Sequence, residues 1–524
     1  MKSRITKCCG TKKRILIVNC FFDEMRFAVG RNTQIPQAMG PVYLAGAFSP
    51  HACEVRLYNE MSSGPLEDER LLSWPDMLVL TGLNTAFDRM LHLTAYARTK
   101  NKNVVVVAGG PAVRNLPILS KRYFDYPCLG DVEELQQVIE DAFDKDHASC
   151  RMSPRYDLAY WMTHYGYVES SRYCNFRCSF CSLTGEGHGY QKYDLEFIRN
   201  QIVGLGKRKD PILFIDNNFY GNDRQFFLDR LELIRELRKD GYIKSWSALV
   251  TNDFFYDNDN VALVKDTGCM CLFSGLESFD FEWLKSVNKC QNAHTAQIEM
   301  IRNCLEHGIV FLYGSVFDVA RRRLVDLKRE LDFILDHPEM TLPSYLSIIV
   351  PILGTPYFYK CLEAGLILPL TRVRDLESTT LCVKPLDPIA EVTDFIYDIQ
   401  TLRGYKRRIM QYSWKFYKRY RSFLSNFQML VALSNAIKLS CQITPNKNHL
   451  PHSLRSRNEL RTHLSTTEIL DTVYEPAFRV ESRYQTYFKP TYLTDENGRI
   501  SRELEADIYR TREDSMKKAV RARN

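Results

Sequence analysis

Three cysteines lie close together in the stretch RYCNFRCSFCSL, residues 172–183. Cys174, Cys178 and Cys181 have the spacing of metal-binding thiols, but closed structural metal sites are usually four-coordinate. They could form a Cys₃His zinc site with His188, a disulfide with one spare thiol, or an iron–sulfur cluster with one iron left open. An open coordination position is typical of a metal site that performs chemistry. The spacing alone leaves these alternatives open.

The elements that must position the cysteines are predicted to be repeated strand–helix units. Strands are expected over residues 166–171, 211–216, 245–252, 269–277, 309–317 and 344–351, with helical stretches between them. Six such units predict a partial barrel, because a full eight-unit barrel usually needs ~250 residues. The cysteines follow the first strand, and loops at that end of barrel strands are where such folds place their chemistry.

The first 145 residues predict a second α/β unit. Short apolar strands are expected over 14–22, 54–60, 76–83, 104–110 and 126–130, with helices between them. This alternation indicates a doubly wound, Rossmann-like parallel sheet. Ligands of such sheets bind beyond the carboxyl ends of the strands. That edge would carry Asn19, Thr81, Leu83, Gly109 and Gly110.

A polar bridge over residues 145–157 separates the two predicted units. We therefore expect a Rossmann-like domain at 1–148, a partial barrel at 155–390 and a mainly helical domain at 391–524. Residues 405–423 alternate aromatic and basic side chains. An amphipathic helix with its aromatic face in the core is favoured over a surface that stacks nucleic acid.

The overall composition indicates an ordinary globular protein. Its 524 residues carry a formal charge of +7, which permits an anionic substrate without requiring nucleic acid. Sixteen cysteines are too few for a disulfide scaffold, and Cys269 and Cys271 in an apolar run favour a buried strand. No apolar run is long enough for a signal peptide or a membrane span. We expect a cytoplasmic protein that acts on a small molecule.

The C-x₃-C-x₂-C pattern, with Phe180 before its last cysteine, resembles the signature of the radical S-adenosylmethionine (SAM) superfamily. The resemblance implies a [4Fe–4S] cluster on Cys174, Cys178 and Cys181, with the open iron chelated by the amino and carboxylate groups of SAM. One electron from the cluster then cleaves SAM to a 5′-deoxyadenosyl radical. An external donor such as flavodoxin or ferredoxin would supply that electron.

Later segments resemble the same superfamily. They are PILFIDNNFYGN, SGLESFD with the LKSVNK that follows it, and PILGTPYFYKCLEAGLI. The resemblance implies that SAM contacts come from Phe180, Asp216, Asn217, Glu277, Ser278 and Ser315. Ordinary barrel packing is the alternative for each of them. The run YGSVFDVARRR departs from the usual pattern, so SAM contacts are not carried over to Asp318 or to Arg321, Arg322 and Arg323.

The N-terminal unit resembles the cobalamin-binding domain that precedes the barrel in one radical SAM branch. The matching segments are ILIVNCFF, IPQAMGPVYLAGAF, WPDMLVLTGLNT, VVVVAGGPAV and FDYPCLGDVEELQQVI. The resemblance implies cobalamin at the edge formed by Asn19, Thr81, Leu83, Gly109 and Gly110. The Asp-x-His-x-x-Gly motif is absent, as it is from many radical SAM relatives, so the resemblance is compatible with a corrin that has no histidine ligand. The alternative is a Rossmann-like domain that binds no cofactor.

Together these resemblances imply a cobalamin-dependent radical SAM methyltransferase. It would methylate an unactivated carbon of a small-molecule or natural-product substrate through the 5′-deoxyadenosyl radical and methylcobalamin. An oxidative cyclase or ring-rearranging enzyme with the same cofactors is the first alternative. A non-catalytic sensor of redox state or cobalamin is the second.

Overall fold

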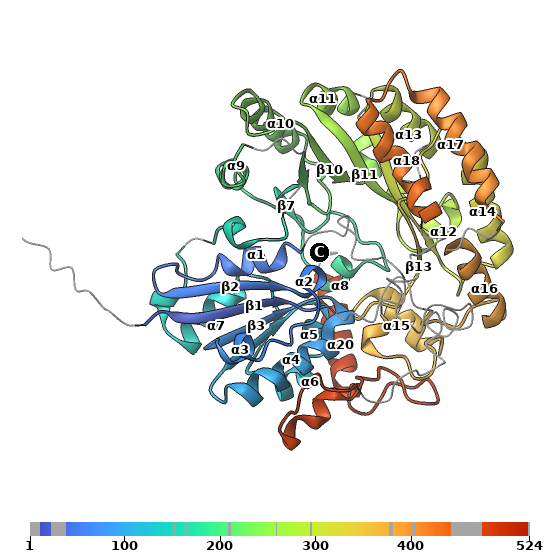
Figure 1. Cartoon of the computed structure of the whole chain (residues 1–524). Coiled ribbons are helices and arrows are strands. Elements are labelled where there is room, and N and C mark those ends of the chain that lie inside the picture. Colours follow the sequence, from blue (N-terminus) through green and yellow to red (C-terminus); the bar gives the residue numbers. More distant parts are fainter. Residues whose placement is uncertain are drawn as a thin grey trace, which may run out of the picture. The chain divides into compact units, whose positions relative to one another are not determined.

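The computed structural model describes most of the chain, in two compact units. The described residues are 11–21, 38–150, 152–162, 165–207, 211–257, 259–293, 296–376, 381–400, 404–441 and 474–521. Among these, the first unit contains the residues up to Trp161 together with 474–491, and the second contains 162–441 and 492–521 (Figure 1).

A five-stranded parallel sheet forms the centre of the first unit. Its order is β2-β1-β3-β4-β5, with β1 Lys13–Asn19, β2 Cys53–Asn59, β3 Met77–Thr81, β4 Val105–Gly109 and β5 Tyr126–Cys128. Figure 1 shows α1 on one face of this sheet and α3 and α4 on the other. The central strands are apolar throughout because both faces are covered. The doubly wound sheet predicted from the sequence is confirmed.

Short helices connect these strands. Their bounds are α1 Gly40–Ala45, α2 Glu60–Ser63, α3 Glu69–Ser73, α4 Phe87–Lys100, α5 Pro111–Asn115, α6 Pro117–Tyr123 and α7 Glu134–Ala142. Helix α4 is the longest, and its side chains from Phe87 to Ala97 are all buried. Part of its cover comes from far along the chain.

Residues 474–491 pack on α4. His92 stacks on Phe488 with ring centroids 4.6 Å apart, and the Tyr474 hydroxyl donates to the Asp88 carboxylate at 3.0 Å. The sequence placed this stretch in a C-terminal helical domain at 391–524. Its contacts instead join it to the first unit, because its aromatic rings and backbone pack on and bond to His92, Asp88 and Tyr96 of α4.

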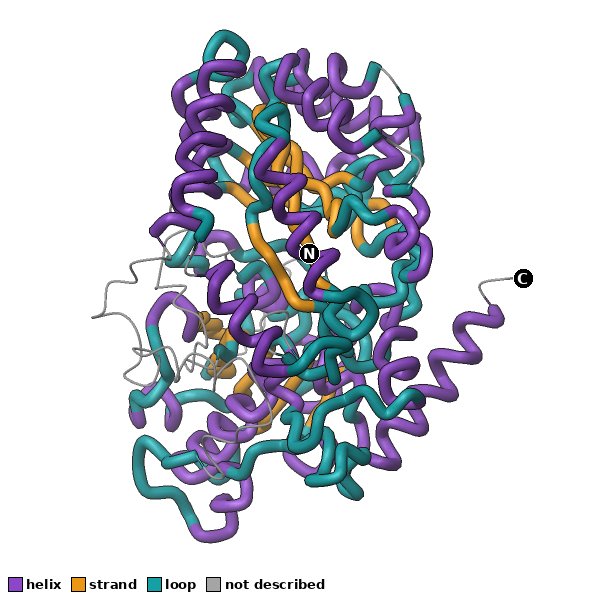
Figure 2. Tube along the Cα trace, turned by 90° about the vertical axis from the view of Figure 1, so that its right-hand side faces the viewer, coloured by secondary structure: helices purple, strands orange, loops and turns teal. Residues whose placement is uncertain are grey.

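The second unit contains a six-stranded parallel sheet. Its order is β13-β12-β11-β10-β9-β6, with β6 Gly166–Val168, β9 Ile212–Phe214, β10 Trp246–Val250, β11 Cys269–Glu277, β12 Val310–Phe317 and β13 Tyr345–Ile348. Every strand lies within a segment that the sequence predicted. The partial six-unit barrel is therefore confirmed, and Figure 2 shows its strands enclosed by helices.

Helices follow the strands of this second sheet in the expected alternation. Their bounds are α8 Ser182–Glu186, α9 Leu195–Gly204, α10 Arg224–Lys239, α11 Asn260–Asp266, α12 Phe281–Ser286, α13 Gln297–Glu306, α14 Leu324–Asp336 and α15 Pro356–Glu363. Phe214, Phe219 and Trp246 pack together at the centre of the sheet. Cys269 and Cys271 are buried on β11, as the sequence suggested.

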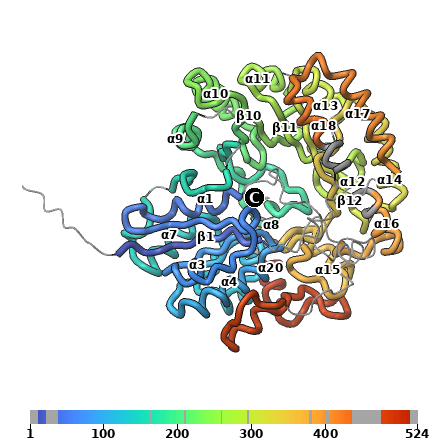
Figure 3. Tube along the Cα trace, viewed as in Figure 1, coloured from blue at the N-terminus to red at the C-terminus, as the bar shows by residue number. Residues whose placement is uncertain are grey.

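The C-terminal helices extend the second unit. They are α16 Ile389–Gln400, α17 Lys406–Tyr420, α18 Asn426–Cys441 and α20 Glu505–Arg521. Helix α18 packs on β12, and α17 packs on α14 and α18 (orange in Figure 3). Ile409, Tyr412, Phe416 and Tyr420 are buried, so the aromatic face of α17 belongs to the core. In the described part of the chain, no helix has the length and apolar character needed to cross a bilayer.

Candidate functional site

The loop that carries the cysteines is closed at its base by a short antiparallel ladder. Strand β7, Ser171–Arg172, pairs with β8, Gln191–Lys192, on either side of the loop. Asp216, just beyond β9, accepts hydrogen bonds from the backbone N–H groups of Ser170 and Ser171, each at 2.6 Å. Because this carboxylate is fully buried, it fixes the point at which the loop leaves the sheet.

The three cysteines are largely buried and remain free thiols. Burial raises the pKa of Cys174 and raises that of Cys181 to about 11, and the neighbouring Cys178 sulfur adds to both increases. The Phe176 N–H donates to the Cys174 sulfur at 3.5 Å, and the Gln291 side-chain N–H donates to Cys178 at the same distance. N–H donors aimed at cysteine sulfurs suit thiolates that bind a metal.

This donor set fits a cluster better than a single ion. Within the described residues, no three His, Cys, Asp or Glu side chains are arranged to hold one metal ion. His188, the proposed fourth zinc ligand, stacks on Tyr173 with centroids 4.6 Å apart. Three cysteines on a [4Fe–4S] cluster bind three separate irons, so they need not point at one centre.

Glu277 and Ser315 lie side by side at the carboxyl ends of β11 and β12. Glu277 has a φ of 67°, a left-handed conformation that costs a non-glycine residue ~1–3 kcal/mol and is often found at functional sites. Its carboxylate pairs with Lys289 at 3.0 Å. The Ser315 hydroxyl is buried and has no hydrogen-bond partner among the described residues. Both features suit a polar ligand at this edge.

Two other residues predicted to contact SAM form hydrogen bonds with the protein itself. Asp216 is fully buried, and its oxygens are occupied by Ser170 and Ser171. Ser278 donates to Glu330 at 2.7 Å and accepts from Arg322 at 3.1 Å. The sequence could not foresee these partners, because they come from distant segments. Asp216 and Ser278 stay predictions as SAM contacts, and their internal bonds also fix the segments around the site.

The remaining two candidates lie near the surface of the site. Asn217 is exposed just after β9. Phe180 is half-buried, with its ring 6.3 Å from that of Trp283. The Lys289 ammonium lies 5.7 Å from the centre of the Phe180 ring. Both residues stay predictions as SAM contacts.

The run after β12 has a structural role. Arg322 is buried and pairs with Glu330 at 2.6 Å and with Asp280 at 3.2 Å. Asp318 is buried and accepts from the Trp283 indole N–H at 3.0 Å and the Tyr357 hydroxyl at 3.1 Å. Through these bonds the charges of this segment hold neighbouring elements together.

Sequence reasoning missed several groups around the cysteines. Asn218 donates to Asn175, next to Cys174, at 2.8 Å, so the loop after β9 touches the cysteine loop. Lys289 and Gln291 approach from the segment after α12. Lys289 ends the LKSVNK stretch quoted above, which was the available signal. Nothing in the sequence marked Gln291.

In the first unit, the carboxyl ends of the strands form one row. Asn59, Asn19, Thr81, Gly109 and Cys128 are neighbours in register across the five strands. The strand order reverses between β1 and β3, which is where open α/β sheets bind ligands. This switch point lies at Asn19 and Thr81, as predicted. The Asn19 amide donates to Asn59 at 2.9 Å.

The loops after β3 and β4 approach each other by backbone. Gly110 has a φ of 119°, and a Cβ there would lie 2.2 Å from the Gly82 carbonyl oxygen. Only glycine is compatible with that approach. Leu83 follows with 68% of its surface exposed. These two loops therefore offer backbone and one apolar side chain, which fits a large, flat ligand.

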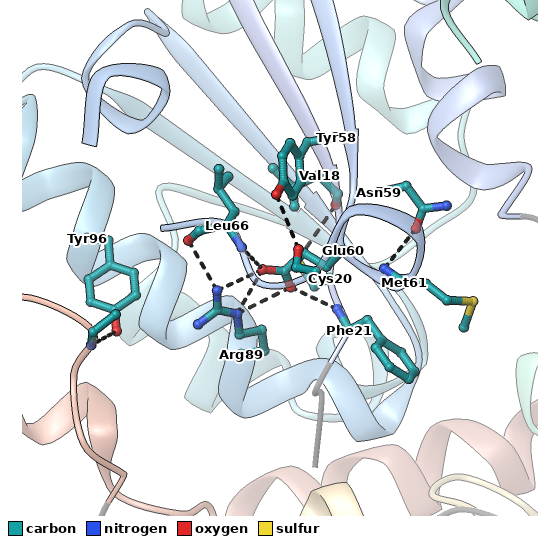
Figure 4. Close-up of polar contacts among 12 residues, drawn as sticks. Val18, Cys20, Phe21, Tyr58, Asn59, Glu60, Met61, Leu66, Arg89 and Tyr96 are labelled. Carbon is teal, nitrogen blue, oxygen red and sulfur yellow. Dashed lines mark hydrogen bonds and ion pairs between the residues drawn. The ribbon is translucent and has the colours of Figure 1, made fainter. Parts of the chain in front are cut away.

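A buried ion pair lies just beyond the carboxyl ends of β1 and β2 (Figure 4). Glu60, which follows β2, accepts two hydrogen bonds from Arg89 to Oε1, at 2.8 and 2.9 Å. It also accepts from the backbone N–H groups of Phe21 at 3.0 Å and Leu66 at 2.8 Å. Glu60 thereby ties the chain after β1, the chain after α2 and helix α4 to one carboxylate.

Comparison with known proteins matches residues 168–317 to the family model described as "Radical SAM superfamily". Two curated relatives come from Chlorobaculum tepidum. Bacteriochlorophyllide d C-12(1)-methyltransferase is 27% identical over 36% of this chain and 41% of its own length. Bacteriochlorophyllide d C-8(2)-methyltransferase is 23% identical over 56% of this chain and 69% of its own. The chain thus spans less than half of the first relative and about two thirds of the second.

A solved structure shares the fold. It is described as the cobalamin-dependent S-adenosylmethionine radical enzyme OxsB with aqua-cobalamin bound. The match covers 86% of this chain and 84% of that one, with a TM-score of 0.57 and 16% identity. At that identity the likeness describes the fold.

Proposed function

We propose that this chain is a cobalamin-dependent radical SAM enzyme that methylates carbon, and the match of residues 168–317 to the radical SAM family model supports the proposal. The substrate would be a small molecule. The transfer to carbon is taken from the two curated relatives, whose names place a methyl group at numbered carbons. Cobalamin is taken from the five-stranded sheet and from the OxsB likeness.

One observation carries the proposal. Three free, largely buried cysteines share a loop that begins at the carboxyl edge of the same sheet that presents Glu277 and Ser315. Lys289 connects the two groups, since it bonds to Glu277 and its charge interacts with the sulfurs of Cys178 and Cys181. When bound, the cluster would supply the electron that cleaves SAM, and cobalamin would carry the methyl group.

The chain's own residues have separate roles. Cys174, Cys178 and Cys181 would bind the cluster, and Asp216 would hold their loop at its base. Glu277 would accept hydrogen bonds from SAM with its charged carboxylate. Ser315 would donate a hydrogen bond to SAM from its hydroxyl, which has no partner among the described residues. Asn19, Thr81, Leu83, Gly109 and Gly110 would line the cobalamin edge of the first unit.

The test is anaerobic reconstitution with iron and sulfide, followed by an assay for 5′-deoxyadenosine from SAM and dithionite. The wild type should form it, and Cys178→Ala should lose both the cluster absorbance and the cleavage. Cys150→Ala, which removes an exposed cysteine, is the matched control and should retain both. An intact cluster that does not cleave SAM would contradict the proposal that the chain is a radical SAM enzyme.

Methyl-deuterated SAM then separates methylation from cyclisation. Transfer predicts a product heavier by one CD₃ group in place of a hydrogen. A product that has only lost hydrogens would favour the oxidative alternative.

A further inference from the structure

The cysteine loop is held against a second segment, residues 287–291, which follows α12. The Ser179 N–H donates to the Val287 carbonyl at 2.9 Å, and the Asn288 side-chain N–H donates to the Arg177 carbonyl at 2.7 Å. Asn288 has a φ of 56°, a left-handed turn that asparagine tolerates. The two bonds bracket Cys178, so this segment forms a fixed wall beside the central cysteine.

The same segment is anchored to the sheet behind it. Asn292 is buried and donates to the carbonyls of Gly275 at 2.7 Å and Leu276 at 3.0 Å. The Tyr256 hydroxyl donates to the Gln291 carbonyl at 2.9 Å. The side chains that this wall directs at the cysteines are therefore placed by bonds on both sides.

Gln291 contributes a hydrogen-bond donor to a sulfur. Its Nε2 lies 3.5 Å from the Cys178 sulfur, and both side chains are more than nine-tenths buried. A buried amide that points at a ligand sulfur stabilises negative charge on that sulfur. Hydrogen bonds to the sulfurs are among the factors that set the reduction potential of an iron–sulfur cluster.

Lys289 contributes a buried positive charge. Its ammonium bonds to Glu277 at 3.0 Å and lies 5.7 Å from the Phe180 ring. The Phe180 ring belongs to the residue that precedes Cys181, so this ammonium, paired with the Glu277 carboxylate, lies next to the cysteine loop.

We propose that Gln291 and Lys289 set the reduction potential of the cluster held by Cys174, Cys178 and Cys181. The inference rests on the proposed function. On reduction, the cluster gains one electron from an external low-potential donor, and its charge becomes more negative by one. The Gln291 N–H and the Lys289 ammonium both stabilise that added charge, so they make the cluster easier to reduce.

The experiment is a redox titration of anaerobically reconstituted protein, without SAM, at fixed pH. Gln291→Met removes the donor at similar volume, and Gln291→Glu places a carboxylate in the same position. The potential should fall in the order wild type, Gln291→Met, Gln291→Glu. The first step should be at most about a tenfold change in the ratio of oxidised to reduced cluster, since a hydrogen bond to a charged group contributes ~1.5 kcal/mol and only the part that differs between the two oxidation states shifts the potential. That corresponds to ~59 mV for one electron.

Lys289→Met should also lower the potential, because it removes the cation and leaves Glu277 uncompensated. Lys289→Arg should retain the wild-type potential. The matched controls are Lys285→Met, from an exposed pair with Glu282, and Gln225→Met on α10, and neither should shift the potential.

Iron and sulfide content measured in parallel keep this inference separate from the proposed function. A wild type without a [4Fe–4S] cluster would contradict the proposed function. Full clusters with one common potential in all Gln291 and Lys289 variants would overturn the inference alone. If Lys289→Met loses its cluster, the order of reduction potentials among wild type, Gln291→Met and Gln291→Glu still tests the inference.

Discussion

Glu60 and Glu277 are two buried carboxylates at the carboxyl ends of parallel strands, and each pairs with one cation. Glu60 accepts from Arg89 and from two backbone N–H groups, so its oxygens are fully used. Glu277 has one described hydrogen-bonding partner, Lys289, and sits in a left-handed backbone conformation. The Glu60–Arg89 pair therefore has the bonding expected of a structural ion pair. The Glu277 carboxylate can still accept hydrogen bonds from a ligand.

The difference indicates how to separate structure from function among buried charges. A buried carboxylate whose oxygens all bond to a cation and to backbone N–H groups holds loops in place, and its loss should destabilise the unit. A charge held in a strained conformation, beside an unpartnered hydroxyl, should matter more to ligand binding than to stability. The four variants below test this contrast.

The largest effect on stability is expected for Glu60→Gln. It leaves Arg89 buried beside a neutral amide, and breaking a buried pair costs ~3 kcal/mol or more. Urea unfolding followed by circular dichroism should show the loss in the transition of the first unit. Glu54→Gln, in the exposed Arg56–Glu54 pair, is the matched control and should cost less than ~1 kcal/mol. Equal losses of unfolding free energy in Glu60→Gln and Glu54→Gln would show that the buried pair stabilises the unit no more than the exposed pair.

Glu277→Gln should affect chemistry more than folding. It replaces the charged acceptor proposed for SAM, and a hydrogen bond to a charged group contributes ~1.5 kcal/mol or more. The rate of 5′-deoxyadenosine formation at limiting SAM should therefore fall about tenfold. The unfolding free energy should change less than in Glu60→Gln, because Glu60 also holds two backbone N–H groups and Glu277 has no described bond to backbone N–H. An unchanged rate would contradict the ligand role of Glu277.

Gly275→Ala should give a smaller, several-fold loss of the same activity. A Cβ at this position would lie 2.4 Å from a Glu277 carboxylate oxygen and 3.2 Å from the Lys289 nitrogen. The carboxylate would have to move, while the cysteine loop keeps its own bonds. Gly189→Ala is the control, because no atom lies within 4 Å of a Cβ placed there. A wild-type rate in Gly275→Ala would show that the position of Glu277 does not matter.

The smallest effect concerns Asp76, whose pair with Arg14 at 2.9 Å is partly exposed. Partial burial alone would raise the pKa of Asp76, but the hydrogen bonds and charge of Arg14 outweigh it and lower the pKa. The pair then stabilises the fold above the unfolded pKa of ~3.9, and this contribution disappears as the pH falls through the lower folded value.

Asp76→Asn should thus cost up to ~1 kcal/mol at neutral pH and little below about pH 3. Unfolding measured across the acid range checks this prediction. A cost that persists at the lowest pH would show that the loss comes from packing rather than charge.

The sequence could supply most of the fold because its signals were local. Each strand is a short apolar run bounded by turns, and parallel pairing then brings Asn19, Thr81 and Gly109 to one edge without further information. The three cysteines were equally visible, since their spacing lies within one loop.

The sequence could not predict which distant residues contact the cysteine loop. Gln291 reaches Cys178 across more than a hundred positions, and Asp216 is engaged by Ser170 and Ser171 from another strand. Such bonds depend on how β6, β9 and β11 stand beside one another. The same is true of residues 474–491, whose place on α4 depends on bonds to Asp88 and ring contacts with His92 from far along the chain.

The most direct test of the central claim is electron–nuclear double resonance on the reduced, reconstituted protein. SAM labelled with ¹⁵N in its amino group would be added under conditions that prevent turnover. If Cys174, Cys178 and Cys181 leave one iron open for SAM, the label should show a clear hyperfine coupling to the cluster. A fully reduced cluster with bound SAM and no ¹⁵N coupling would contradict the account.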